Sequence, residues 1–116
     1  MTPFGARLRA LRQARGVTLK EMASALQVSP AYLSALEHGR RGRPSVGLIH
    51  QVNEFFGLIW DDAEEMARLA RLSHPKVTLD TSGLSPEATE LANLLAGRIR
   101  RLPPEVIKEM RRLLGE

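Results

Sequence analysis

Residues 16–45 read GVTLKEMASALQVSPAYLSALEHGRRGRPS, and the order of helix signals in this stretch decides the fold. Thr18 is a favourable helix N-cap, and Glu21 three residues later completes a capping-box pattern. Ser29 is a second N-cap, and Pro30 fits the first helical position, where a backbone N–H is not needed. The stretch therefore predicts two short helices joined by a tight turn.

The apolar residues of this stretch recur at the spacing that two helices packed against each other require. The first of these helices runs to about Leu26, Gln27 and Val28 form the connection, and Gly39 ends the second. Two helices joined by so short a turn make a helix-turn-helix, whose second helix projects an outer face that fits the major groove of B-DNA. The inward positions are Met22, Ala23, Val28, Leu33 and Leu36, and the outward positions of the second helix are Ala31, Tyr32, Ser34 and Ala35.

A flexible cationic loop follows the second helix at once. Arg40, Arg41 and Arg43 lie among glycines just past the C-terminal end of that helix, where a neighbouring phosphate strand would pass. Phosphate contacts position a protein on DNA, whereas base contacts carry the sequence information. The sequence therefore predicts that the loop binds the DNA backbone while the helix reads the bases.

The flanking sequence completes a domain of five helices. One helix precedes the quoted stretch, a fourth starts near Ser45, and a fifth begins at Trp60 or Asp61. The fifth helix is expected to end before Ser73, because Pro75 disfavours helical geometry at the residue before it. The apolar stripes of these helices are Phe4, Leu8 and Leu11; then Val46, Ile49, Val52 and Phe56; then Met66, Leu69 and Ala70.

The pattern changes after the fifth helix. Residues 76–80, KVTLD, alternate apolar and polar side chains and predict a short strand. Ser85 and Pro86 repeat the cap-and-proline start of a helix, and Pro103 and Pro104 separate that helix from a last one. We therefore expect an all-α chain with a helix-turn-helix DNA-binding domain over residues 1–73 and, over residues 74–116, a short strand followed by a two-helix extension.

Composition limits the classes of function. The chain has 116 residues and no cysteine, so neither a disulfide framework nor a thiolate metal site is expected. Of the net charge of +4, residues 1–60 hold eight lysines and arginines against three glutamates, which indicates a polyanionic partner or, as the alternative, a solvated cationic face. Without a signal-peptide pattern or an apolar run near ~18 residues, we expect a soluble, cytoplasmic protein.

The quoted stretch resembles the Cro/C1-type (XRE) helix-turn-helix family of bacterial and phage regulators. The resemblance covers residues 4–70 and implies a lambda-repressor-like fold whose third helix recognises DNA and whose following loop contacts the DNA backbone. It also implies an ion pair between Arg12 and Glu37, which would position the recognition helix. The residues in matching register are Gly16, Thr18, Glu21, Ala23, Val28, Ser29, Leu33, Glu37, Gly39, Arg40 and Pro44.

The resemblance places the DNA contacts on two helix surfaces and the loop. The chain departs from the family at Leu19, where Gln is common, and along the recognition helix, which lacks the Gln, Asn or Arg often found there. Alanines can touch thymine methyl groups, and Tyr32 or Ser34 can donate one hydrogen bond, so specificity is expected to rest more on DNA shape, on dimer spacing or on an arginine in a narrow minor groove. The expected DNA-binding residues are Thr18, Leu19, Lys20, Ser29, Pro30, Ala31, Tyr32, Ser34, Ala35, His38, Arg40, Arg41 and Arg43.

The C-terminal extension is expected to dimerise the protein. A helical pair of this size has too little core to be stable alone, and a strand edge leaves backbone groups that a second copy can satisfy. Helix-turn-helix proteins read two half-sites as dimers. The alternative is that these residues pack back on the first domain. The expected dimer contacts are Val77, Leu79, Leu91, Leu95, Ile99, Val106, Ile107, Met110, Leu113 and Leu114.

The sequence thus predicts a DNA-binding transcriptional regulator, a repressor that reads an inverted-repeat operator as a homodimer, without a cofactor, metal or evident small-molecule effector. His38, His50 and His74 lack metal-ligand spacing, and no glycine-rich phosphate loop follows a strand, so an enzyme is not expected. An antitoxin or protein-binding adaptor that uses the same domain is the alternative. Membrane binding is disfavoured, because the arginines lie in a turn rather than along an amphipathic helix.

Overall fold

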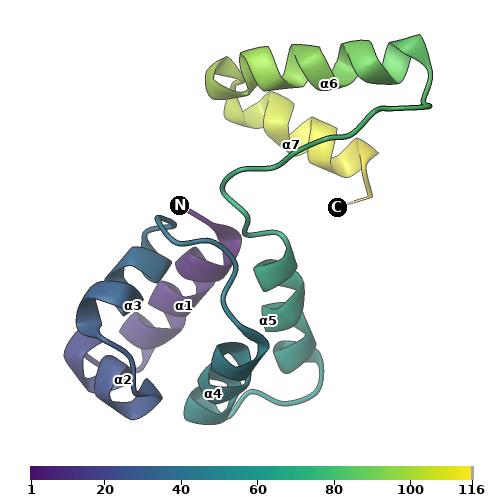
Figure 1. Cartoon of the computed structure of the whole chain (residues 1–116). Helices are drawn as coiled ribbons and strands as arrows, with labels where there is room; N and C mark the ends of the chain where they lie inside the picture. Colours follow the sequence, from purple (N-terminus) through teal and green to yellow (C-terminus); the bar gives the residue numbers. More distant parts are fainter. Residues whose placement is uncertain (116) are drawn as a thin grey trace. The chain divides into compact units, whose positions relative to one another are not determined.

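The computed structural model describes residues 1–115, and every regular element in that range is helical (Figure 1). The chain divides into two compact units, one from Met1 to Val77 and the other from Thr78 onwards. The all-α class expected from the sequence is confirmed. The elements are α1 (Pro3–Ala14), α2 (Leu19–Leu26), α3 (Pro30–Glu37), α4 (Val46–Phe56), α5 (Asp61–Arg71), α6 (Pro86–Arg98), the 3₁₀ turn η1 (Ile99–Arg101) and α7 (Pro104–Leu113).

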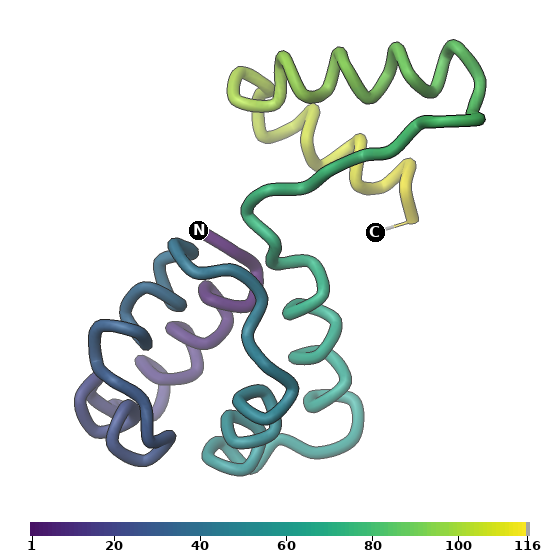
Figure 2. Tube along the Cα trace, in the orientation of Figure 1, coloured from purple at the N-terminus to yellow at the C-terminus, as the bar shows by residue number. Residues whose placement is uncertain are grey.

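The first unit packs its five helices around an aliphatic core. Helix α1 contacts α3 and α5, α2 contacts α3 and α4, and α4 contacts α5, an arrangement that can be followed along the trace in Figure 2. Burial of these apolar side chains is the main stabilising contribution to a domain of this size. The largest fully buried apolar side chains are Phe4, Leu8, Met22, Leu33, Leu36, Val52 and Met66.

Side-chain caps start the helices where the sequence predicts them. The Thr18 Oγ1 accepts the Glu21 N–H at 3.0 Å, and the Ser29 Oγ accepts the Tyr32 N–H at 3.0 Å. Ser45 caps α4 in the same way. Each cap satisfies a backbone donor that the first helical turn leaves without an intrahelical partner. The boundaries of the helix-turn-helix are therefore set by local chemistry as well as by packing.

Helix α5 begins without such a cap. Its N-cap residue is Trp60, which has a φ of +52°, a region that L-residues rarely adopt, and makes no capping hydrogen bond. The Trp60 side chain is 83% exposed. The acidic first turn, with Asp61, Asp62 and Glu64, places negative charge at the positive end of the helix dipole and favours the helix start instead.

Two close approaches seat α1 on the C-terminal end of α3. A Cβ added at Gly5 would overlap the carbonyl oxygen of Leu36 and lie 2.9 Å from that of Glu37. Gly39, at a φ of +72°, ends α3, and a Cβ there would lie 2.7 Å from backbone atoms of Met1. Both positions need glycine for lack of space, and Gly39 also needs it for its left-handed conformation.

A buried hydroxyl joins the two ends of the first unit. The Ser73 Oγ accepts the backbone N–H of Phe4 at 3.0 Å and donates to the carbonyl oxygen of Leu69. Ser73 is buried just past the end of α5, while Phe4 lies in the first turn of α1. The bond satisfies an N–H that the start of α1 cannot pair internally, so α5 closes the domain against α1.

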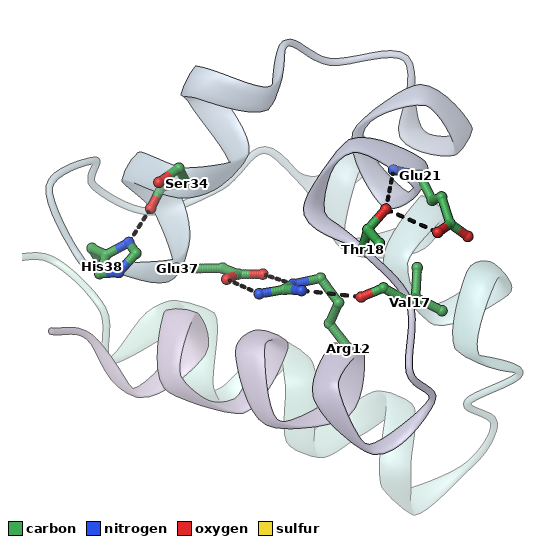
Figure 3. A network of polar contacts seen from close by, with 7 residues as sticks. All are labelled: Arg12, Val17, Thr18, Glu21, Ser34, Glu37 and His38. Carbon is green, nitrogen blue, oxygen red and sulfur yellow. Dashed lines mark hydrogen bonds and ion pairs between the residues drawn. The ribbon is translucent and has the colours of Figure 1, made fainter.

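Arg12 connects α1, α2 and α3 through one guanidinium group (Figure 3). Its Nε and one terminal nitrogen donate to the two carboxylate oxygens of Glu37, at 2.7 and 3.1 Å. The other terminal nitrogen donates to the carbonyl oxygen of Val17, immediately before the α2 cap, at 3.0 Å. The Glu37 side chain is only 1% exposed, so the pair is largely removed from water. The ion pair that the family resemblance implies is thus present.

The second unit differs from the sequence-based expectation at its start. Residues 76–80 belong to no helix or strand within residues 1–115, so the predicted strand is not confirmed. A strand needs a neighbour that bonds to its backbone groups, and the described part of one copy holds no other strand to provide them. The predicted helix to about Arg101 is present as α6 followed by η1.

No side chain from Thr78 to Gly115 is buried. Asp80 begins the turn before α6, where its carboxylate accepts the Ser82 N–H at 2.9 Å; the hydrogen bonds from Ser82 lower the pKa of Asp80.

Large apolar side chains remain exposed along both helices of the unit. The exposed ones include Leu84, Leu91, Leu94, Ile99, Val106, Ile107, Leu113 and Leu114.

Glu37→Gln tests the ion pair. The amide cannot neutralise the Arg12 guanidinium, and its NH2 group cannot accept the hydrogen bond that the second carboxylate oxygen accepts, so we expect the free energy of unfolding to fall by about 1–3 kcal/mol. The control is Glu54→Gln, because Glu54 makes an exposed pair with His50 and its side chain is 70% exposed. Thermal unfolding followed by circular dichroism measures both. Equal melting temperatures for the two variants would contradict the assigned role.

Gly5→Ala tests the contact between α1 and α3. The new methyl group meets backbone carbonyls that cannot turn aside, so we expect a loss of about 1–3 kcal/mol, as in overpacked cores. Gly47→Ala in α4 is the matched control, since the nearest atom to its added Cβ is the Ser45 Oγ at 4.0 Å. That variant should be neutral or more stable by up to about 1 kcal/mol. If Gly5→Ala is as stable as the native protein in urea unfolding, α1 and α3 can move apart to make room for the methyl group, and the assigned contact is contradicted.

Candidate nucleic-acid interface

The turn between α2 and α3 fixes the helix-turn-helix. Gln27 takes the left-handed conformation at a φ of +57°, and the Val28 N–H then donates to the Ala23 carbonyl oxygen at 3.0 Å. This closes the end of α2 with the hydrogen bonds of a left-handed cap, a place where glycine is more common than glutamine. Ser29 immediately caps α3. The two helices pack on each other, as the sequence predicts.

Apart from Tyr32, the outer face of α3 offers small side chains. Pro30 and Ala31 are exposed, whereas Tyr32, Ser34 and Ala35 are half-buried. None of these five side chains carries the paired hydrogen-bond donors and acceptors that read a base edge in two places. The face can therefore approach the floor of a groove closely, but it supplies little direct base recognition by itself.

His38 lies directly after the last residue of α3, and its ring is bound to the helix (Figure 3). Its Nδ1 lies 2.8 Å from the carbonyl oxygen of Ser34. A carbonyl oxygen only accepts, so Nδ1 is the donor in this bond. The side chain is exposed beside the loop that follows, and it contributes to the end of the helix as well as to the candidate interface.

The start of α2 supplies one cation and little else. The Thr18 hydroxyl accepts the Glu21 N–H and donates to the Glu21 carboxylate at 2.9 Å, so its hydrogen-bonding capacity is largely used (Figure 3). Leu19 is half-buried and packs against the core. Lys20 is exposed. Of the three residues expected to contact DNA here, Lys20 alone presents a charge to solvent.

The cationic loop leaves α3 at Gly39. The Arg40 N–H donates to the Ala35 carbonyl oxygen at 2.9 Å, which ties the first loop residue to the helix. The side chains of Arg40, Arg41 and Arg43 are all exposed. The three arginines thus follow directly on α3, as their positions in the sequence indicate, and all three are open to solvent.

The contact between Arg41 and Tyr32 follows from no pattern in the sequence. The guanidinium carbon of Arg41 lies 5.7 Å from the centre of the Tyr32 ring, over the ring. The two residues are separated by most of α3 and by the turn into the loop, so no helical or strand periodicity relates them. An arginine near an aromatic residue in the sequence is too common a pattern to predict such a contact.

The charge balance of this surface is strongly positive. Glu37 is neutralised by Arg12, and the hydrogen bonds that Arg12 donates to the Glu37 carboxylate raise the pKa of Arg12 above its usual value. Glu21 is the remaining acid between residues 18 and 43. The other charged groups of that range are Lys20, Arg40, Arg41 and Arg43.

Other kinds of site find no support in the described part of the chain. Residues 1–115 hold no group of three or more His, Cys, Asp or Glu side chains placed to bind a metal ion. No helix in the same range has the length and apolar character needed to cross a bilayer.

Comparison with known proteins agrees with this geometry. Residues 3–65 match the family model described as a helix-turn-helix domain. Over 59 residues the chain is 44% identical to the HTH-type transcriptional regulator DdrOP3 of Deinococcus deserti. This match covers 51% of this chain and 45% of that protein. Over 54 residues it is 41% identical to the HTH-type transcriptional repressor RghR of Bacillus subtilis. This match covers 47% of this chain and 40% of that protein.

A second Bacillus subtilis relative, the uncharacterized HTH-type transcriptional regulator RghRB, is 40% identical over 52 residues, 45% of this chain and 37% of that protein. The matched segment thus spans less than half the length of each of these relatives. No solved structure gives a significant match. The family model spans more than half of the chain and includes α1 to α4, with the recognition helix and the cationic loop. The chain therefore belongs to the helix-turn-helix domain family, in agreement with its resemblance to the Cro/C1-type regulators.

Proposed function

We propose that the protein is a DNA-binding transcriptional regulator. The observation that carries this proposal is the outward face of α3, whose side chains other than Tyr32 are small and permit close approach to a groove, with the exposed Arg40, Arg41 and Arg43 in the loop that follows. Phosphate neutralisation by such a loop supplies affinity for any duplex. Relatives that match this region are named as transcriptional regulators, which supports the same role.

Within that role, repression is the form of regulation we favour. One matching relative, RghR, is named as a transcriptional repressor. A protein that occupies DNA through a compact interface blocks other proteins from the same site without needing a further contact. Footprinting on the DNA upstream of the protein's own gene is the direct test of the proposal. Protection of no site there or elsewhere in the genome at moderate salt would contradict it.

We also propose that the protein binds as a homodimer through its second unit. The support is the number of large apolar side chains that α6, η1 and α7 leave exposed, together with the lack of any buried side chain from Thr78 to Gly115. Two copies would bury these faces and present two recognition helices. The operator would then be an inverted repeat with half-site centres about 10 bp apart, or a multiple of that spacing.

The same apolar faces suit a second candidate role. An antitoxin or adaptor would cover α6 and α7 with a different protein instead of a second copy. The exposed apolar area favours a protein partner. Homodimerisation is preferred because the charges from Asp80 to Arg112 nearly balance, five acids against six bases, so two copies meet without net repulsion.

Arg40→Ala and Arg43→Ala test the phosphate contacts. Each should weaken binding to all duplexes alike and lower the slope of log affinity against log salt by roughly one unit. Arg71→Ala is the matched control, because Arg71 is an exposed arginine on α5 outside the candidate interface. Fluorescence anisotropy over a salt series measures the slopes. Unchanged slopes in both loop variants would show that these arginines point elsewhere.

Leu91→Glu tests the dimer. A charge at this 60% exposed position of α6 should dissociate two copies, because a carboxylate cannot be buried unpaired in an apolar contact. Leu72→Glu provides the control, since Leu72 is 51% exposed in the first unit. Sedimentation at tens of micromolar should give a monomer for Leu91→Glu and a dimer for Leu72→Glu. A monomeric native protein would contradict homodimerisation and favour the adaptor.

A further inference from the structure

Tyr32 is a fixed platform on the recognition helix. It occupies the first turn of α3, where its backbone N–H is bound by the Ser29 cap. Its side chain is half-buried and packs against the core of the domain. Packing of the ring against the core restricts its rotation, so the ring presents a defined face to a group stacked on it.

Arg41 is the loop arginine held by this platform. Its guanidinium carbon lies 5.7 Å from the Tyr32 ring centre, within the range of a cation–π contact. Arg12 of α1 and Arg15 just after it instead donate hydrogen bonds inside the domain, to Glu37 and to the Phe56 carbonyl oxygen. Arg41 has no hydrogen-bond partner within residues 1–115. Stacking uses the face of a guanidinium and leaves the N–H groups on its edge free.

The recognition helix lacks the kind of donor that Arg41 offers. Pro30, Ala31, Ser34 and Ala35 cannot form a two-point hydrogen bond to a base. The commonest specific contact in the major groove is a bidentate bond from an arginine to the O6 and N7 of guanine. A guanidinium held at the face of α3 would bring this contact to the groove from a residue outside the helix.

We propose that Arg41, stacked on Tyr32, reads a guanine in the major groove and is the main base-reading residue of each half-site. Arg40 and Arg43 have no aromatic platform within residues 1–115 and bind phosphates. This inference rests on the proposed DNA-binding function. It assigns specificity to a pair of residues, one that carries the hydrogen-bond donors and one that orients them.

The competing assignment is that Arg41 is a third phosphate contact. The two differ in what is lost when the side chain is removed. Loss of a phosphate contact weakens binding to every duplex by the same factor, whereas loss of a base contact removes the preference at one base pair. The experiment therefore measures preference at each position and not affinity alone.

The test begins with the full chain and a pool of randomised DNA duplexes, from which the native protein enriches its preferred sequence. Affinities are then measured for that duplex and for its single base-pair replacements, with native protein, Arg41→Ala and the matched variant Arg40→Ala. We expect Arg41→Ala to lose a preference of about 5- to 150-fold for guanine at one base pair in each half-site, the range for a bidentate contact. Arg40→Ala should keep every preference.

Tyr32 variants separate the platform from the hydroxyl. Tyr32→Phe retains the aromatic face and should retain the guanine preference at the base pair assigned to Arg41. Tyr32→Leu removes the face and should lose that preference although Arg41 is present. In the Arg41→Ala background, Tyr32→Leu should cause no further change at that base pair, because the two residues act as one unit. Circular dichroism establishes that each Tyr32 variant is folded. Arg41 is exposed, so the result for Arg41→Ala does not depend on this control.

The outcomes distinguish this inference from the function on which it rests. A native protein that enriches no sequence contradicts both. A native protein with a clear preference that Arg41→Ala preserves at every position, with a uniform loss of affinity, contradicts the inference alone and makes Arg41 a phosphate contact. Retention of the guanine preference by Tyr32→Leu, or its loss in Tyr32→Phe, would overturn the role of the ring as a platform.

Discussion

The Arg12 guanidinium is the constraint on which the rest of the domain depends. Glu37 lies at the end of α3 with its carboxylate almost fully buried, and a buried charge is tolerated only when it is paired and hydrogen-bonded. Arg12 satisfies both carboxylate oxygens and also binds the Val17 carbonyl oxygen before α2. One side chain of α1 thereby sets the far end of the recognition helix and the start of its partner helix together. The close contact at Gly5 removes the remaining freedom between α1 and α3.

Much of this domain could be predicted from local sequence. The hydroxyl caps at Thr18, Ser29 and Ser45 act over three residues, so the helix starts follow from the sequence without knowledge of the fold. The spacing of the apolar residues predicted the five-helix domain. The prediction that Val46 belongs to the buried stripe of α4 was wrong: Val46 is 75% exposed, because it lies at the first position of the helix. The Arg12–Glu37 pair came from the family resemblance, since no periodicity connects residues on separate helices.

The features that escaped prediction depend on neighbours distant in sequence. The alternation of residues 76–80 describes side chains, but a strand also needs a partner for its backbone, and the described chain offers none. The contact between Arg41 and Tyr32 arises only when the loop turns back along α3. The Phe4–Ser73 bond joins the ends of a domain that local signals treat as unrelated segments. Each required the folded arrangement, which sequence patterns describe only in part.

The position of Trp60 has a practical consequence for spectroscopy. The chain has one tryptophan and one tyrosine, and the tryptophan is 83% exposed in the native state. Its indole is already surrounded by water when the domain is folded, so its emission is that of a hydrated fluorophore before and after unfolding. The tyrosine, Tyr32, lies instead on α3 beneath the guanidinium of Arg41. The two chromophores thus report on different events: Trp60 on whatever covers the turn between α4 and α5, and Tyr32 on what happens at the recognition helix.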